Sequence, residues 1–129
     1  MPLPGGGLLI NDAYIANPLS MRAALEHLAD QASGRRTVAI LGEMAELGPE
    51  SPRYHEEIGT AAKNLRVDVV VGVGELARSY EPDNWCADPA AAVEMARKLV
   101  RPGDCVLVKG SRSAGLEVVA EALASVAAR

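Results

Sequence analysis

Polar residues that could take part in chemistry follow the apolar runs of this chain. Asp12 and Asn17 follow the first run, and Glu43 and Glu46 follow the second. The last run leads into residues 109–113, with two cations and two serines just before a helical pattern. A helix N-terminus attracts anions through its free amides and its dipole, and an arginine can bind a carboxylate through two hydrogen bonds. Residues 109–113 are therefore a candidate anion site.

Each of these residues also has an ordinary structural interpretation. Asp12 could accept hydrogen bonds from a ribose diol, or it could be a turn or cap residue. Asn17 precedes a proline, the combination typical of a helix start. Glu43 and Glu46 could be solvated loop acids, and residues 109–113 could form a solvated turn. Taken one at a time, the residues leave both interpretations open.

The histidines and cysteines give weaker signals. His55 lies early in a predicted helix beside two glutamates, where a lone histidine is usually partly exposed, and we expect it on the surface. We expect His27 on the polar side of its own helix. Cys86 and Cys105 form no Cys-x-x-Cys pair, and only the two histidines could complete a zinc site with them. We therefore expect reduced core thiols, typical of a cytoplasmic protein, and no metal site.

The hydrophobic pattern predicts the strands and helices that carry these residues. Apolar runs rich in β-branched residues predict strands at residues 8–10, 37–41, 67–73 and 105–108, with a weaker one at 84–87. The runs are continuous, as in parallel strands that are covered on both faces. Apolar spacings of three and four predict helices over residues 21–28, 54–65, 92–100 and 116–123.

Capping residues mark the ends of these helices. Asn17, Ser51 and Asp88 each precede a proline and are predicted N-caps, Gly34 is a predicted C-cap, and a short helix could follow Gly74. Strands alternating with helices predict one α/β domain over residues 1–129, with a mostly parallel sheet of about five or six strands between helices in three layers. Ligands bind such sheets at the carboxyl ends of the strands, where the polar residues gather.

Composition excludes several classes of protein. The 129 residues carry a net charge of −4, with one Trp, three Tyr and no Phe, which argues against nucleic acid as a partner. The apolar runs are far shorter than the roughly 20 residues of a membrane span, so membrane insertion is not expected. Residues 1–7 are uncharged and glycine-rich, and we expect a turn there and not a signal peptide.

One segment matches a nucleotide-binding motif. Residues 72–77 match the dinucleotide fingerprint Gly-x-Gly-x-x-Gly/Ala, which leaves a small NAD-binding module as an alternative. The fingerprint normally belongs to the first strand–turn–helix unit, whereas this match lies in the third. The sequence contains no Gly-x-x-x-x-Gly-Lys-Ser/Thr phosphate loop.

Three segments together resemble motifs of the Mur ligase family, in the same order and at the same spacing. Residues 12–21 resemble an Asp-x-Tyr-Asn-Ala-Asn-Pro-x-Ser-Met signature, and residues 41–48, with His55 after them, resemble a Leu-Gly-Asp/Glu-Met-x-Glu-Leu-Gly loop. Residues 109–112 resemble a Lys-Gly-Ser-Arg segment. Ile15 is a departure, because the family has an asparagine there and isoleucine forms no side-chain hydrogen bond.

The resemblance is to the C-terminal, Rossmann-like domain of the Mur ligases that add D-alanyl-D-alanine to UDP-N-acetylmuramoyl-tripeptide. It implies that the N-terminal UDP-binding domain and the central ATPase domain are absent from this chain. It further implies a cytoplasmic, ATP-dependent ligase of peptidoglycan precursor synthesis, in which the central domain holds Mg²⁺ and most of ATP. The isolated domain should then be inactive. A non-catalytic, partner-binding α/β domain is a second alternative.

The resemblance also implies roles for single residues. Those implied to bind ATP are Asp12, Tyr14 and Asn17. Those implied to line the pocket of the incoming dipeptide are Glu43, Glu46, Leu47, Lys109, Ser111, Arg112 and Ser113. Among these, Arg112 would bind the carboxylate of the dipeptide. Neither a catalytic residue nor a metal ligand is expected within this chain.

Overall fold

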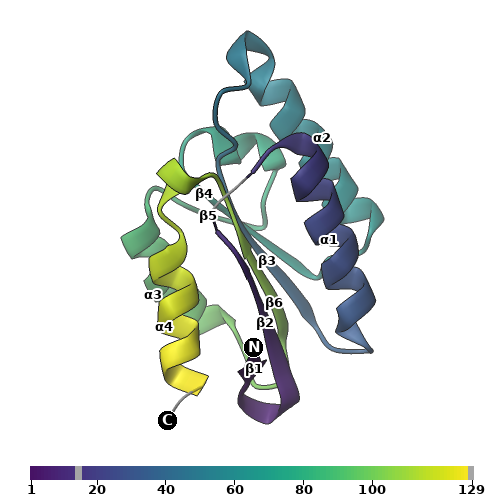
Figure 1. Ribbon diagram of the computed structural model, residues 1–129, viewed down its shortest axis with the longest axis vertical. Coiled ribbons are helices and arrows are strands. Elements are labelled where there is room, and N and C mark those ends of the chain that lie inside the picture. Colours follow the sequence, from purple (N-terminus) through teal and green to yellow (C-terminus); the bar gives the residue numbers. More distant parts are fainter. Residues whose placement is uncertain (14–15, 128–129) are drawn as a thin grey trace.

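A single six-stranded sheet runs through the molecule in the order β1-β2-β6-β3-β4-β5 (Figure 1). The computed structural model describes residues 1–13 and 16–127. The strands are β1 (Pro2–Leu3), β2 (Gly7–Asp12), β3 (Thr37–Gly42), β4 (Val69–Val73), β5 (Asn84–Cys86) and β6 (Cys105–Lys109). All neighbouring strands are parallel except β1 and β2. The predicted α/β class, the mostly parallel sheet and the weak strand near residue 84 are thereby confirmed.

In the described part of the chain, four α-helices cover the two faces of the sheet. They are α1 (Pro18–Ala32), α2 (Ser51–Asn64), α3 (Pro89–Leu99) and α4 (Glu117–Ala127). Helices α1 and α2 lie on one face, and α3 and α4 lie on the other (Figure 1). Short 3-10 helices lie in the segments between these elements: η1 (Pro4–Gly6), η2 (Gly48–Glu50), η3 (Leu76–Tyr80) and η4 (Arg112–Ala114). Among the described residues, no helix is long and apolar enough to cross a membrane.

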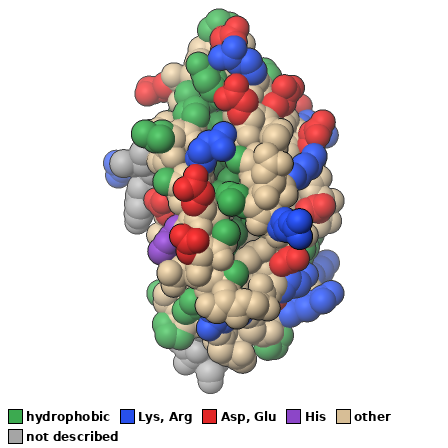
Figure 2. Space-filling view, turned by 90° about the vertical axis from the view of Figure 1, so that its right-hand side faces the viewer, with side chains coloured by type: hydrophobic (Ala, Val, Ile, Leu, Met, Phe, Trp, Pro, Cys, Tyr) green, Lys and Arg blue, Asp and Glu red, His purple; other side chains and the backbone are tan. Residues whose placement is uncertain are grey.

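Alternating side chains of the central strands build two cores. In β3, Val38 and Ile40 pack toward α3 and α4, whereas Ala39 and Leu41 pack toward α1 and α2. Every residue of β3 and β6 is buried, which explains why these strands have continuous apolar sequences. On the side of α1 and α2, charged side chains of both signs are interspersed (Figure 2).

The helix ends confirm two of the three predicted N-caps. The Asn17 side chain accepts a hydrogen bond from the Ser20 amide at 2.8 Å, and Asp88 caps α3 through the Ala91 amide at 2.9 Å. The prediction for Ser51 was wrong, because Ser51 is the first residue of α2 and Glu50 precedes it without a side-chain cap. A proline can follow Ser51 there because the early amides of a helix lack internal acceptors.

Two further local predictions also need correction. Helix α1 ends at Ala32, and its C-cap is Ser33 in the left-handed conformation, with Gly34 one residue beyond. Residues 1–7 are more than a turn, because Pro2 and Leu3 pair with Leu8 and Gly7 as a short antiparallel strand. Both differences depend on hydrogen bonds at single residues, which hydrophobic periodicity does not encode.

Candidate ligand-binding site

The strand order brings the predicted site residues to one rim of the sheet. Strand β6 lies between β2 and β3, so that Asp12 is opposite Lys109 and Lys109 is opposite Leu41. Strand β4 lies beyond β3. The segments that follow these strands therefore meet at the carboxyl ends, where open α/β sheets bind their ligands.

Asp12 and Lys109 form an ion pair at this rim. The Lys109 Nζ atom donates to Asp12 Oδ2 at 2.6 Å. The Lys109 side chain is 1% exposed, whereas that of Asp12 is 47% exposed. The ammonium group is thus directed to the end of β2, and Lys109 is not among the residues that line the nearby pocket. Asp12 is the member of the pair that a ligand can reach.

Asn17, the N-cap of α1, is a further predicted nucleotide ligand after Asp12. Asn17 is exposed, and its side-chain oxygen is engaged in the cap of α1. Its side-chain nitrogen is then the polar atom that remains for a ligand. Tyr14, which we expected to bind ATP, and Ile15, the departure from the family motif, lie outside the described residues.

A pocket of about 380 Å³ lies beside the ends of β3 and β6. Four of its polar or charged lining residues were predicted as dipeptide ligands: Glu43, Glu46, Ser111 and Ser113. Leu47, also predicted, contributes an apolar part of the lining. Arg112 is exposed in η4 between the two serines, and it does not line the pocket itself. The rim therefore has two parts, with Asp12 on one side and this pocket on the other.

The pocket loop, residues 43–47, is built by hydrogen bonds to neighbouring elements. The Glu43 carbonyl accepts from the Ser111 amide at 2.9 Å, which joins the loop to the turn after β6. The Glu43 carboxylate accepts from the Leu76 amide at 2.7 Å. Glu43 thus supports η3, whereas the exposed Glu46 has a left-handed backbone with φ of 59°. Non-glycine residues in this conformation are rare and cluster at functional sites.

The expectation that His55 lies on the surface was wrong, because its side chain is fully buried. Its Nε2 atom accepts a hydrogen bond from the Met44 amide at 3.0 Å, and its Nδ1 atom lies 2.7 Å from the Ser51 carbonyl oxygen. Burial lowers the pKa of His55. The helical spacing of three and four that joins His55 to Ile58 and Ala62 was the signal that could have placed it on the buried face.

The dinucleotide-like segment does not form a dinucleotide site. It leads into η3, a five-residue 3-10 helix, and not into an α-helix whose N-terminus could bind a pyrophosphate. A side chain at Gly72 would lie 2.8 Å from the Ala77 carbonyl oxygen, so this glycine serves internal packing. The NAD alternative therefore lacks the geometry it requires.

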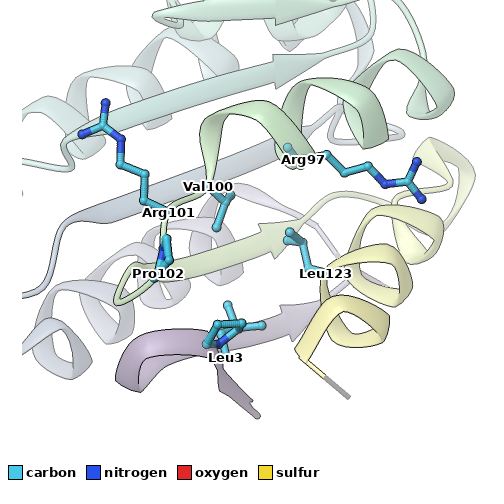
Figure 3. Close-up of a pocket in the computed structure, with 8 residues that line it drawn as sticks. Leu3, Arg97, Val100, Arg101, Pro102 and Leu123 are labelled. Atoms are coloured by element: carbon cyan, nitrogen blue, oxygen red, sulfur yellow. The ribbon is translucent and has the colours of Figure 1, made fainter. Parts of the chain in front are cut away.

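A second cavity, of about 310 Å³, lies away from the rim among β1, α3 and α4. Leu3, Val100, Pro102 and Leu123 turn toward one another in it, and the side chain of Arg97 extends away (Figure 3). Such an apolar lining offers few polar partners to a charged ligand. The rim is therefore the better candidate site.

Comparison with known proteins decides the family. Residues 3–112 match the family described as Mur ligase, glutamate ligase domain. The chain belongs to the Mur ligase family. This Mur ligase domain is 43% identical to the UDP-N-acetylmuramoyl-tripeptide–D-alanyl-D-alanine ligase of Mycobacterium leprae, over 92% of the chain and 28% of that relative. The Escherichia coli enzyme of the same name is 38% identical over 90% of the chain and 26% of the relative.

Solved structures agree with this assignment. The crystal structure of MurF ligase from Thermotoga maritima in complex with ADP matches 97% of the Mur ligase domain with a TM-score of 0.81 and 27% identity. The match covers 30% of that chain. The domain thus spans under a third of the length of these relatives, and it shares their fold over nearly its whole length.

Proposed function

We propose that this domain is the C-terminal part of an ATP-dependent ligase of peptidoglycan precursor synthesis. The ligase would add D-alanyl-D-alanine to UDP-N-acetylmuramoyl-tripeptide. The 43% identity to a relative named for this reaction, over 92% of the chain, carries the proposal. The expected companion is a central ATPase domain of the same enzyme, onto which the rim would close.

The reaction joins a carboxylate to an amine. A carboxylate resists attack by an amine, and ATP would supply the phosphoryl group that activates it. The domain's own contribution would be to bind and orient the incoming dipeptide and to exclude water from the activated carboxylate. Closure of a C-terminal domain over the nucleotide is a general way to meet these requirements.

The nucleotide edge would consist of Asp12, Tyr14 and Asn17. Asp12 fits this role, because Lys109 engages Oδ2 and the half-exposed carboxylate keeps a second oxygen for a ribose hydroxyl. The phosphates and Mg²⁺ would be bound by the central domain.

The pocket beside β3 and β6 would bind the dipeptide. Arg112, exposed at its edge, would bind the dipeptide carboxylate, and the exposed Glu46 would face its amino group. Ser111 and Ser113, whose hydroxyls lie 3.0 Å apart, would add hydrogen bonds. Glu43 and Lys109 would act by holding the loop and Asp12 in place. A cytoplasmic location is proposed because Cys86 and Cys105 are buried free thiols.

An amide NMR titration of the labelled chain with ATP and, separately, with NAD tests the nucleotide edge. We expect ATP to shift the amides near Asp12 and Asn17, and we expect the shifts to weaken in Asp12→Ala. NAD should leave Gly72 and Gly74 unchanged. Shifts with NAD confined to those glycines would contradict the proposal, and a lack of response to both nucleotides would favour a partner-binding domain.

A further inference from the structure

Two buried aromatic side chains form hydrogen bonds to the backbone of the pocket loop and of the strand end before it. His55 Nε2 accepts from the Met44 amide at 3.0 Å, and the Tyr80 hydroxyl donates to the Gly42 carbonyl at 2.7 Å. Both side chains are buried, and their ring centroids lie 5.0 Å apart. Neither ring lines the pocket. The loop conformation is therefore fixed from the protein interior.

One peptide group joins the two walls of the pocket. The carbonyl of Glu43 and the amide of Met44 belong to the same peptide unit, which is planar. Its oxygen accepts from the Ser111 amide at 2.9 Å, and its N–H donates to His55. A rotation of this peptide would disturb both hydrogen bonds together, so the orientation that His55 imposes is transmitted to the turn that carries Arg112.

We infer that His55 is a positioning residue, whose neutral imidazole fixes the pocket loop against the Ser111–Ser113 turn through the Glu43–Met44 peptide. The identity of the ligand in this pocket rests on the proposed function, whereas the hydrogen bonds of His55 are independent of that function. The role differs from that of a dipeptide-binding residue, because His55 acts from behind the loop.

The hydrogen bonds determine which ring nitrogen carries the proton. A backbone amide can only donate, so Nε2 must be unprotonated where it faces Met44. The proton is then on Nδ1, which donates to the Ser51 carbonyl at 2.7 Å. Protonation of Nε2 would place two donors against each other and release the loop. Burial opposes this protonation, whereas the Ser51 carbonyl and the Glu43 carboxylate favour it, and Tyr80 adds only a neutral ring.

Two substitutions separate the effect of losing the hydrogen-bond acceptor of His55 from the effect of losing the volume of its ring. His55→Leu fills the space but leaves the Met44 amide unpaired, whereas the oxygen of Gln in His55→Gln can reach the Nε2 position. We expect His55→Leu to shift the Ser111 amide resonance and to weaken D-alanyl-D-alanine binding on the order of tenfold, with partial recovery in His55→Gln. His27→Leu, at an exposed position, is the matched control. A folded His55→Leu with an unchanged Ser111 amide and unchanged affinity would overturn the inference.

The wild-type chain gives a second test if His55→Leu does not fold. Ring nitrogen NMR should show the neutral Nδ1-protonated form, and the amides of Met44 and Ser111 should shift together when His55 is protonated. An Nε2-protonated neutral ring, or loop amides that ignore the protonation, would overturn the inference. If these amides respond but D-alanyl-D-alanine binds neither the wild-type chain nor any variant, the positioning role stands and the proposed ligand is wrong.

Discussion

At the scale of single residues, Asp12 and Lys109 depend on each other unequally, because the lysine is buried and the aspartate is half exposed. Removing Asp12 takes the carboxylate away from a buried ammonium. Removing Lys109 leaves a carboxylate that water can still reach. The energetic effect of each substitution should follow this difference in solvation.

We expect Asp12→Ala to lower the free energy of unfolding by about 2 kcal/mol, and Lys109→Met to change it by less than about 1 kcal/mol. Urea denaturation followed by circular dichroism measures both values. A larger loss in Lys109→Met than in Asp12→Ala would show that the ammonium stabilises the rim by more than its pairing with Asp12.

The buried His55 should make stability depend on pH. Burial lowers its pKa in the folded state, so the unfolded chain binds the proton more readily. Stability from this residue is therefore complete above the unfolded pKa of about 6.5 and declines as the pH falls below it, by at most about 2 kcal/mol at pH 5. The difference in unfolding free energy between wild type and His55→Gln should shrink over this range. A constant difference from pH 7.5 to 5 would contradict the account, and His27→Gln supplies the control.

At the scale of elements, helix α2 and η3 are in backbone contact through Gly59. A side-chain carbon at Gly59 would overlap the Tyr80 carbonyl oxygen. Gly59→Ala should force α2 and η3 apart and lower the free energy of unfolding by roughly 1–3 kcal/mol. Thr60→Ala, at an exposed position in the same helix, should change it by less than about 0.5 kcal/mol. Thermal and urea denaturation of the pair measures the difference, and equal stability of the two variants would refute the contact.

Asn17 has a role in α1 that can be separated from ligand binding. Asn17→Ala should lower the free energy of unfolding by about 1 kcal/mol, because the Ser20 amide loses its acceptor. Asn17→Asp should keep the cap but lose the side-chain donor. Weaker ATP binding by Asn17→Asp at unchanged stability, measured by NMR titration and denaturation, is the result expected of a nucleotide contact. Unchanged ATP binding would assign Asn17 to the cap alone.

Some features of the elements could be predicted from the sequence, and others could not. Continuous apolar runs were enough to predict β3 and β6, since both faces of these strands are covered. Asn17 and Asp88 were predictable as caps because each hydrogen bond spans only three residues. Strand order was not predictable, because it depends on packing between distant segments.

The site was predictable to the same extent. The rim and most of its residues followed from the polar residues after parallel strands, and the roles of these residues came from the resemblance to the family. The pairing of Asp12 with Lys109 spans 97 residues and could not be read from local sequence. The helical spacing of His55 indicated a position on the buried face of its helix, but the adjacent glutamates led us to expect a surface position.

At the scale of the whole molecule, the chain corresponds to under a third of its relatives. We expect the purified chain to release no ADP from ATP when given the tripeptide nucleotide and D-alanyl-D-alanine, since the phosphates of ATP would be bound by the central domain. A coupled ADP assay checks this, with a full-length relative as the positive control. ADP release that depends on both substrates would mean that this domain activates the carboxylate by itself.

Binding of the dipeptide at the rim of this domain can be measured directly by amide NMR with D-alanyl-D-alanine. We expect the dipeptide to shift the amides of Glu46, Ser111 and Ser113, and we expect Arg112→Ala to reduce those shifts. L-alanyl-L-alanine should produce smaller ones. Rim amides that stay unchanged, or shifts confined to the apolar cavity around Leu3 and Leu123, would contradict the account.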